Sequence, residues 1–296
     1  MVPGPLTDRI VADFDAMPAQ LKAAALYVLE RPSDVALLSM REQARQAGVQ
    51  PATMTRLAKR LGFAGYDTVR ELYAGAIRDG GLGFAGKAGA QVAQQQAIGD
   101  TALAADMIAA VTAQIGRLQS PQVLEDLSAA ARLLAEADRV YCLGLRSSHP
   151  VAWHLHYVLS LLGGRAVLLD GAAGTGVDAL GNAGSNDVLC AVSVAPYTRA
   201  TVEAAQGAHA RGVPIVAVTD SPLSPLARLA QRTVLVSTTS PSFFHTMAPA
   251  FVVGEILAAI VAGRGGARSL EALHRTEAHL ADFRVHWSPR DDRELP

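Results

Sequence analysis

The chain contains two regions with different patterns of hydrophobic and polar residues. Up to about residue 78, apolar residues recur every three or four positions, which predicts amphipathic helices over 6–17, 21–30 and 66–77. From residue 139 onward, five short runs are almost continuously apolar, and each leads into a helical segment, the first four through a polar or glycine-containing turn. We therefore expect an α/β chain, in which an all-helical amino-terminal domain precedes a doubly wound, five-stranded parallel sheet.

Changes in composition indicate the domain boundaries. Residues 79–100 are rich in glycine and carry few bulky apolar groups, which is typical of a linker or a loosely held segment. Helical spacing returns over 106–118 and 121–135, and Leu270, Leu273 and Leu280 predict a helix in the tail. The predicted organisation is a helical domain, a linker with a linking helix, a sheet domain, and a carboxyl-terminal helix with a tail, over residues 1–78, 79–119, 120–265 and 266–296.

Residues 39–66, SMREQARQAGVQPATMTRLAKRLGFAGY, predict two short helices joined by a tight turn. Ser39 and Glu42 have the spacing of a capping box, which begins a helix. Gly48 can adopt the left-handed conformation that ends it, and Pro51 suits the first position of the next helix. This pattern predicts a helix-turn-helix.

The second of these helices is predicted to have one buried face and one free face. Met54, Leu57, Ala58 and Leu61 have the spacing of a buried stripe. A DNA-reading helix needs short side chains near its start for base edges and cations further along for phosphates. The candidate DNA-binding residues on the free face are Gln50, Ala52, Thr53, Thr55, Arg56, Lys59 and Arg60. The alternative is a small helical bundle with a solvated polar face.

Charge and cysteine usage bear on the oligomeric state and the cellular location that we expect. Residues 39–73 carry six cations against three anions, in a chain whose net charge is −1. Because this excess is small, we expect DNA binding to require an oligomer, a homodimer or homotetramer, that presents several copies. Cys142 and Cys190 lie in apolar runs and suit buried thiols. With no signal-peptide pattern and no long uninterrupted apolar run, we expect a cytoplasmic protein without a membrane partner.

Polar loops follow the first and third predicted strands. We assume the strand order 2-1-3-4-5, which the sequence itself cannot show; in this order, ligands bind outside the carboxyl ends of these two strands. The first strand leads into residues 144–148, and the third into residues 193–199. Both loops place hydroxyl groups beside a helix start, where free N–H groups favour an anion. The alternative is that Ser148 and Thr198 only cap their helices.

Taken together, these motifs resemble a known family. Residues 139–262 resemble a SIS domain, the sugar isomerase fold that binds phosphosugars, through GLRSS, DVLCAVSVAPYTRATVEAAQGAHARGVPIVAVTDSPLSPLA and SPSFFHTMAPA. Residues 6–78 resemble the amino-terminal domain of RpiR-family transcriptional regulators. The resemblance implies a regulator that binds operator DNA as an oligomer and responds to a sugar phosphate, with no cofactor. The candidate effector-binding residues are Arg146, Ser147, Ser148, Ser193, Tyr197 and Thr198.

The chain departs from the usual SIS pattern in both loops. The common motif after the third strand is Ser-x-Ser-Gly-x-Thr, but Ala195 and Pro196 replace its second serine and its glycine. Arg146 stands where the first loop usually has a glycine, and its guanidinium group is a candidate anion clamp. The effector can therefore differ from a conventional sugar phosphate.

Other residues give weaker indications. His154 and His156 are two positions apart on a predicted helix and face different directions, so we expect no metal site. His149 follows the first loop, and the family likeness suggests that Ser240 and Ser242 approach the pocket from a neighbouring subunit. His245 and Glu255 offer no evident acid–base pair beside the loops, so we expect no catalytic residue and no enzyme.

Two other functions remain open at this point. One is a phosphosugar isomerase with an accessory helical domain. The other is a metabolite-binding protein whose helical domain docks onto a protein instead of DNA.

Overall fold

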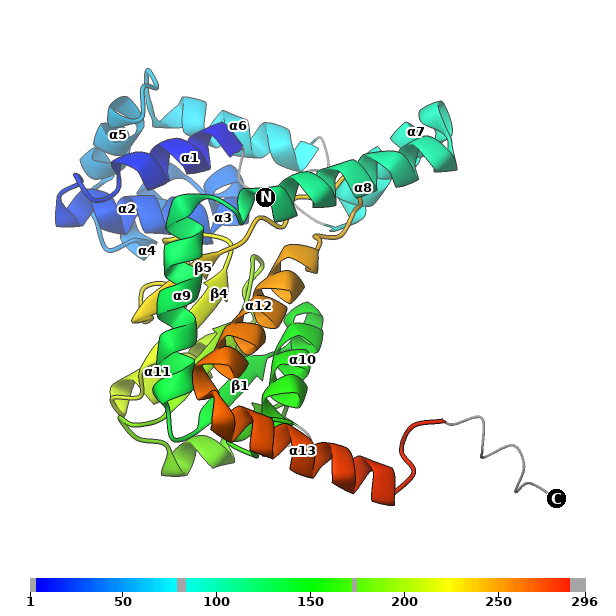
Figure 1. Cartoon of the computed structure of the whole chain (residues 1–296). Helices are drawn as coiled ribbons and strands as arrows, with labels where there is room; N and C mark the ends of the chain where they lie inside the picture. Colours follow the sequence, from blue (N-terminus) through cyan, green and yellow to red (C-terminus); the bar gives the residue numbers. More distant parts are fainter. Residues whose placement is uncertain (1–3, 79–83, 172–174, 288–296) are drawn as a thin grey trace. The chain divides into compact units, whose positions relative to one another are not determined.

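The computed structural model describes residues 4–78, 84–171 and 175–287 (Figure 1). By its internal contacts the chain divides into two compact units. Unit 1 consists of residues 1–113 together with 239–246, and unit 2 of residues 114–238 together with 247–296.

Unit 1 begins with six helices that enclose a small apolar core. They are α1 (Gly4–Asp13), α2 (Ala19–Glu30), α3 (Pro32–Leu37), α4 (Met40–Gln46), α5 (Pro51–Arg60) and α6 (Tyr66–Arg78). Leu6, Met54 and Tyr73 are almost fully buried. The Tyr73 hydroxyl donates to the Val28 carbonyl oxygen at 3.1 Å, so the burial of this phenol does not leave a polar group unpaired. The all-helical prediction for this region is confirmed.

Helix replaces the loose linker expected after this core. Helix α7 covers Phe84–Ile98 and α8 covers Asp100–Arg117. Alanine and glutamine, which fill much of α7, are strong helix formers, and this propensity outweighs the glycines between them. Gly99 separates the two helices with a φ of +83°, a conformation that glycine adopts at little cost. None of the side chains of α7 is buried. The start of the expected linker, residues 79–83, lies outside the described residues.

Unit 2 contains a five-stranded parallel sheet. Its strands are β1 (Val140–Gly144), β2 (Ala166–Leu169), β3 (Val188–Val192), β4 (Ile215–Thr219) and β5 (Arg232–Leu235). Their order in the sheet is β2-β1-β3-β4-β5, and each neighbouring pair is parallel. This is the order assumed from the sequence, so the predicted doubly wound fold is confirmed.

Helices cover both faces of the sheet. One face packs against α9 (Pro121–Glu136), α10 (His149–Ser160) and α12 (Ala248–Gly265), and the other packs against α11 (Arg199–Ala210). Cys142 and Cys190 are register partners on β1 and β3, and both are buried free thiols, as predicted. Burial raises the pKa of the Cys190 thiol to about 12, because an apolar environment disfavours the thiolate.

Two strands are not followed by the α-helix that the pattern predicted. After β2, the described residues form only a short 3-10 helix over Asp178–Asn182. After β4, residues 221–230 form turns. Pro222 and Pro225 fall within these turns, and proline both lacks an N–H group and restricts the residue before it, which disfavours a helix there.

The carboxyl-terminal helices complete unit 2. Helix α12 is long and apolar enough to cross a membrane by length and composition alone, but it packs Val253, Leu257 and Val261 into the core beside the sheet. Core helices of soluble proteins have the same composition. The predicted tail helix is α13 (Ala267–Asp282), which buries Ala272; its Thr276 hydroxyl donates to the Leu161 carbonyl oxygen at 3.2 Å.

Candidate effector site and helix-turn-helix surface

The two polar loops begin beside each other at the carboxyl edge of the sheet. Strands β1 and β3 are neighbours, and Gly144, the last residue of β1, is in register with Val192, the last residue of β3. The loops that follow therefore leave the sheet from adjacent positions. The geometry agrees with the expected switch point of a doubly wound fold, where ligands bind.

The loop after β1 has a tightly constrained backbone. A Cβ atom at Gly144 would lie 2.6 Å from the Ser148 carbonyl oxygen, so only glycine fits at the end of this strand. Arg146 has a left-handed φ of +56°, which a residue with a Cβ atom adopts only at a cost. Its side chain is exposed at the start of a 3-10 turn over Arg146–Ser148, while Ser148 is buried. The conformation explains why glycine suits this position and leaves the guanidinium group at the loop surface.

The loop after β3 is closed by hydrogen bonds. Buried Ser193 accepts the Thr198 N–H on its hydroxyl oxygen at 3.4 Å, and the peptide bond between Ala195 and Pro196 is cis. The Tyr197 hydroxyl donates to Asp220 Oδ1 at 3.0 Å. Tyr197 therefore points toward the end of β4.

Asp220 is a residue of this site that the sequence analysis missed. It follows β4, and its carboxylate accepts hydrogen bonds from the Ala195 N–H at 3.1 Å and from the Tyr197 hydroxyl. Burial raises the pKa of the Asp220 carboxyl, and the hydrogen bonds from Ala195 and Tyr197 partly oppose that rise. An acidic residue directly after the strand next to β3 was the available signal in the sequence.

The serine and threonine at the two helix starts do not act as side-chain caps. Ser148 precedes α10 and Thr198 precedes α11, yet neither side chain makes a capping hydrogen bond to its helix. Within the described part of the chain, no hydrogen bond of either hydroxyl is found. Capping therefore does not explain these residues, and both hydroxyls remain available to a ligand.

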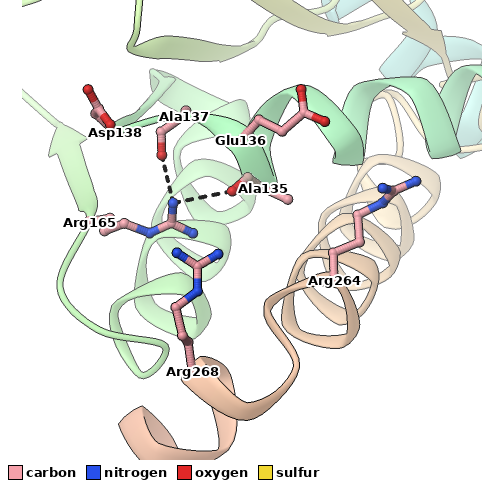
Figure 2. A pocket seen from close by; sticks show the side chains of 7 residues that line it. All are labelled: Ala135, Glu136, Ala137, Asp138, Arg165, Arg264 and Arg268. Atoms are coloured by element: carbon pink, nitrogen blue, oxygen red, sulfur yellow. Dashed lines mark hydrogen bonds between the residues drawn. The ribbon is translucent and has the colours of Figure 1, made fainter.

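A separate cavity of about 390 Å³ lies at the opposite, amino edge of the sheet (Figure 2). Figure 2 shows Arg165 donating to the carbonyl oxygens of Ala135 and Ala137, at 3.3 and 2.6 Å. Two carboxylates also line the cavity, and α9 and α12 end beside it with about half a negative charge each. These groups offset the three guanidinium charges. The cavity residues are Ala135, Glu136, Ala137, Asp138, Arg165, Arg264 and Arg268.

The two short helices predicted over residues 39–66, α4 and α5, form largely as predicted, with a turn between them. The Ser39 hydroxyl accepts the Glu42 N–H at 3.3 Å, Gly48 has a φ of +67°, and Pro51 is the first residue of α5. The Glu42 carboxylate accepts from Arg45 and Gln46, so Ser39 alone provides the observed cap. The predicted buried stripe of Met54, Leu57, Ala58 and Leu61 is confirmed.

Fewer of the candidate DNA-binding residues lie exposed on the free face of α5 than we expected. Gln50, Ala52, Arg56 and Lys59 are exposed, and Thr55 is half-buried, with its hydroxyl donating to the Met40 sulfur at 3.7 Å.

The prediction that Thr53 lies on this free face is wrong, because it is only 1% exposed. It precedes Leu57 by four positions and therefore shares the buried face. Its hydroxyl accepts from Arg56 at 3.1 Å.

Arg60 has a partner within unit 1 that the sequence did not reveal. Its guanidinium group forms an ion pair with Asp13 and also donates to the Ala16 carbonyl oxygen at 3.1 Å. Arg60 therefore ties α5 to the end of α1. Lys59 makes no such contact within the described residues and is the cation on this face that is most available for a phosphate.

The weaker candidates lie apart from the loops or remain untested. The His154 ring lies tilted against the Phe251 ring, with centroids 4.5 Å apart, and burial lowers the pKa of His156. Among the described residues, no group of three or more potential ligands is placed to hold a metal ion. Glu255 is exposed on α12. Ser240, Ser242 and His245 belong to the segment 239–246, which is part of unit 1.

Comparisons with known proteins agree with this architecture. The SIS domain model matches residues 133–262. The solved sugar isomerase domain of an RpiR transcription factor from Sphaerobacter thermophilus is 30% identical, with a TM-score of 0.55, over 60% of this chain and 98% of that one. The Vibrio vulnificus NanR protein complexed with ManNAc-6P is 20% identical, with a TM-score of 0.55, over 94% of this chain and 98% of that one, and shows the same fold.

A curated relative, a UPF0309 protein from Brucella anthropi, is 34% identical over 132 residues, or 38% of this chain. The chain spans 54% of the length of that relative. Unit 2, with its parallel sheet and two polar loops, is thus a SIS domain. The chain belongs to the RpiR family, and its own helical amino-terminal region precedes the SIS domain.

Proposed function

We propose that this chain is a DNA-binding transcriptional regulator, acting as a repressor of a sugar or carbohydrate-derivative pathway. Its SIS domain binds a phosphosugar-type effector, and its helix-turn-helix binds operator DNA. The proposal rests on two features that occur in one chain. The helix-turn-helix exposes Arg56 and Lys59, and the SIS domain has two hydroxyls at its switch point that make no capping hydrogen bond. The ManNAc-6P bound by the related NanR supports a sugar phosphate as the effector class.

The effector site is proposed to lie between the loops after β1 and β3. Its residues are Arg146, Ser147, Ser148, Ser193, Tyr197 and Thr198. Free N–H groups at the starts of α10 and α11 add partial positive charge beside the hydroxyls of Ser148 and Thr198. This combination suits a phosphate monoester.

Substitution of the two hydroxyls tests the site directly. We expect Ser148→Ala with Thr198→Ala to weaken effector binding about a hundredfold or more, because each charge-assisted hydrogen bond contributes roughly 1.5–3 kcal/mol. Isothermal titration with sugar phosphates measures this change. Operator binding without effector should stay nearly intact, since the DNA-reading helix belongs to unit 1. An unchanged effector affinity would refute the two-loop site.

The DNA-binding residues are proposed to be Gln50, Ala52, Thr55, Arg56 and Lys59, with Gln50 and Ala52 near base edges and the two cations on phosphates. A single reading helix carries too few free cations for tight binding at physiological salt. We therefore expect a homodimer or homotetramer, located in the cytoplasm, on a symmetric operator. Light scattering of the full chain measures the oligomeric state.

A phosphosugar isomerase is the second candidate, because a carboxylate with a raised pKa, that of Asp220, lies at the loops. Both of its oxygens accept hydrogen bonds, from Ala195 and Tyr197, so this carboxylate already has a structural role in the loop. We therefore favour a non-enzymatic role. Turnover of an aldose phosphate to a ketose phosphate, lost in Asp220→Asn, would favour the isomerase instead.

A further inference from the structure

One carboxylate joins the strand β4 to the middle of the loop after β3. Asp220 Oδ2 accepts the Ala195 N–H at 3.1 Å, and Asp220 Oδ1 accepts the Tyr197 hydroxyl at 3.0 Å. These contacts involve Ala195 and Tyr197, the residues directly before and directly after Pro196. The same loop begins at Ser193 and ends at Thr198, two of the proposed effector-binding residues.

The ends of the loop have other hydrogen bonds, such as that from the Ser193 N–H to the Val218 carbonyl oxygen at 3.1 Å. Ala195 and Pro196 are exposed and bring no polar side-chain atoms. Within the loop, the hydrogen bond from the Thr198 N–H to the Ser193 hydroxyl oxygen is long at 3.4 Å. The two hydrogen bonds to Asp220 are therefore the contacts that join Ala195 and Tyr197, in the middle of the loop, to the end of β4.

A purely space-filling role does not explain an acid at this position. Burial disfavours an ionised carboxylate, and this raises the pKa of Asp220. An asparagine of the same shape would avoid that penalty, but its amide can accept through only one oxygen. With an asparagine, the Tyr197 hydroxyl would have to accept from the amide N–H, so only a carboxylate gives both donors a charge-assisted hydrogen bond.

We propose that Asp220 is a positioning residue of the effector site, whose carboxylate holds residues 193–198 in the shape that presents Ser193 and Thr198 to the ligand. The identity of this ligand rests on the proposed function. In contrast, the hydrogen bonds by which Asp220 positions the loop are present in the ligand-free protein. The Ala195 N–H is engaged by Asp220, so the ligand is held by the remaining hydroxyl and N–H donors of the two loops.

The first test measures the loop in the full-length protein without ligand. Hydrogen exchange is compared among the parent, Asp220→Asn, Asp220→Ala and Tyr197→Phe. We expect exchange over 193–198 to be at least tenfold faster in Asp220→Ala and intermediate in the other two variants, while β1 and β3 keep their protection. Unchanged exchange in Asp220→Ala would overturn the proposal.

A matched control separates positioning from general stability. Asp187 is also a buried carboxylate and also accepts a main-chain N–H, from Gly184 at 2.9 Å, but it precedes β3 at the opposite edge of the sheet. Asp187→Ala should lower the melting temperature without loosening residues 193–198. Equal loosening of this loop in both alanine variants would show that Asp220 acts only through stability.

The second test measures binding, with ManNAc-6P, glucose 6-phosphate and inorganic phosphate as probes. For the probe that binds the parent most tightly, we expect at least tenfold weaker binding in Asp220→Ala, partial recovery in Asp220→Asn, and parental affinity in Asp187→Ala. If Ser148→Ala with Thr198→Ala abolishes binding but Asp220→Ala does not, the Asp220 proposal fails alone. A third outcome is that no probe binds the parent, while hydrogen exchange over 193–198 is still faster in Asp220→Ala. In that case the proposed function fails, but the role of Asp220 in positioning the loop is supported.

Discussion

Arg146 combines an unfavourable backbone conformation with a position at the proposed effector site. Its φ of +56° is one that glycine adopts freely and arginine does not. We expect Arg146→Gly to change the free energy of unfolding by only about 0–1 kcal/mol, because relief of this strain is offset by the greater freedom of glycine in the unfolded chain. The same variant should bind the effector as weakly as Arg146→Ala, and Arg146→Lys should recover only part of the affinity, since lysine lacks the two-pronged guanidinium donor.

Arg284 provides a control for the backbone effect, because it has a similar φ of +49° but follows α13, away from both loops. Arg284→Gly should change the stability measured by thermal unfolding as little as Arg146→Gly does. In titration, however, Arg284→Gly should keep the parental affinity for the effector. If all Arg146 variants respond to the effector like the parent, the guanidinium group has no role in the site.

Individual residues show where sequence reasoning reached its limit. The positions of Gly48, Pro51 and the buried stripe of α5 follow from local rules and were predictable. The partners of Arg60 and Asp220 lie 47 and 25 positions away in the chain, so no local pattern reveals them. Thr53 was misplaced because the buried stripe of α5 is wider than its apolar residues alone suggest.

Helix α5 is the element proposed to contact DNA. We expect Arg56→Ala with Lys59→Ala to weaken operator binding and to lower the salt slope of binding by about one unit for each lost phosphate contact. Folding should change little, because both side chains are exposed. Fluorescence anisotropy over a range of salt concentrations measures both quantities.

A charge-matched control removes Lys22 and Arg31, which lie on α2 and at the start of α3. This double variant should keep the parental salt slope. If both double variants lose the same amount of DNA affinity, binding depends on the general charge of the helical unit. If Arg56→Ala with Lys59→Ala binds DNA as tightly as the parent, another helix reads the DNA.

The segment 239–246 is a candidate route for coupling the two activities. It connects β5 to α12 of the SIS domain but belongs to unit 1, where Phe244 stacks on Phe84 of α7 with ring centroids 5.1 Å apart and the Phe243 N–H donates to Gln91 at 2.8 Å. We expect Phe244→Ala to leave effector affinity and effector-free DNA affinity near parental values while reducing the effect of one ligand on the other at least threefold.

Titration of the protein–DNA complex with effector measures that coupling. Phe283→Ala serves as its control, because Phe283 is an exposed aromatic residue at the end of α13 in unit 2. Full coupling in Phe244→Ala would exclude this segment as the route.

At the level of elements, the sequence predicted the five strands of a parallel sheet, because continuous apolar runs suit strands that are buried on both faces, whereas their order was assumed. It did not predict α7, where glycines suggested a linker but alanine and glutamine favoured helix. The turns after β4 were also missed, because a helical segment was expected where two prolines disfavour one.

The whole molecule is proposed to transmit a metabolite signal to DNA, and this requires a free energy of coupling between two separate sites. Allosteric coupling typically amounts to about 1–3 kcal/mol, which corresponds to a change in affinity of about 5- to 150-fold. By linkage, DNA must change the affinity for effector by the same factor. This reciprocity distinguishes a regulator from a protein that merely binds both ligands.

The most direct test measures operator affinity of the full chain by fluorescence anisotropy, on DNA from its own upstream region, with and without a saturating sugar phosphate. We predict specific binding without effector and a dissociation constant at least fivefold higher with it, together with an equal loss of effector affinity when DNA is present. Regulation by a sugar phosphate is contradicted if the chain binds no DNA specifically, if the sugar phosphate leaves operator affinity unchanged, or if the protein converts that sugar phosphate into an isomer.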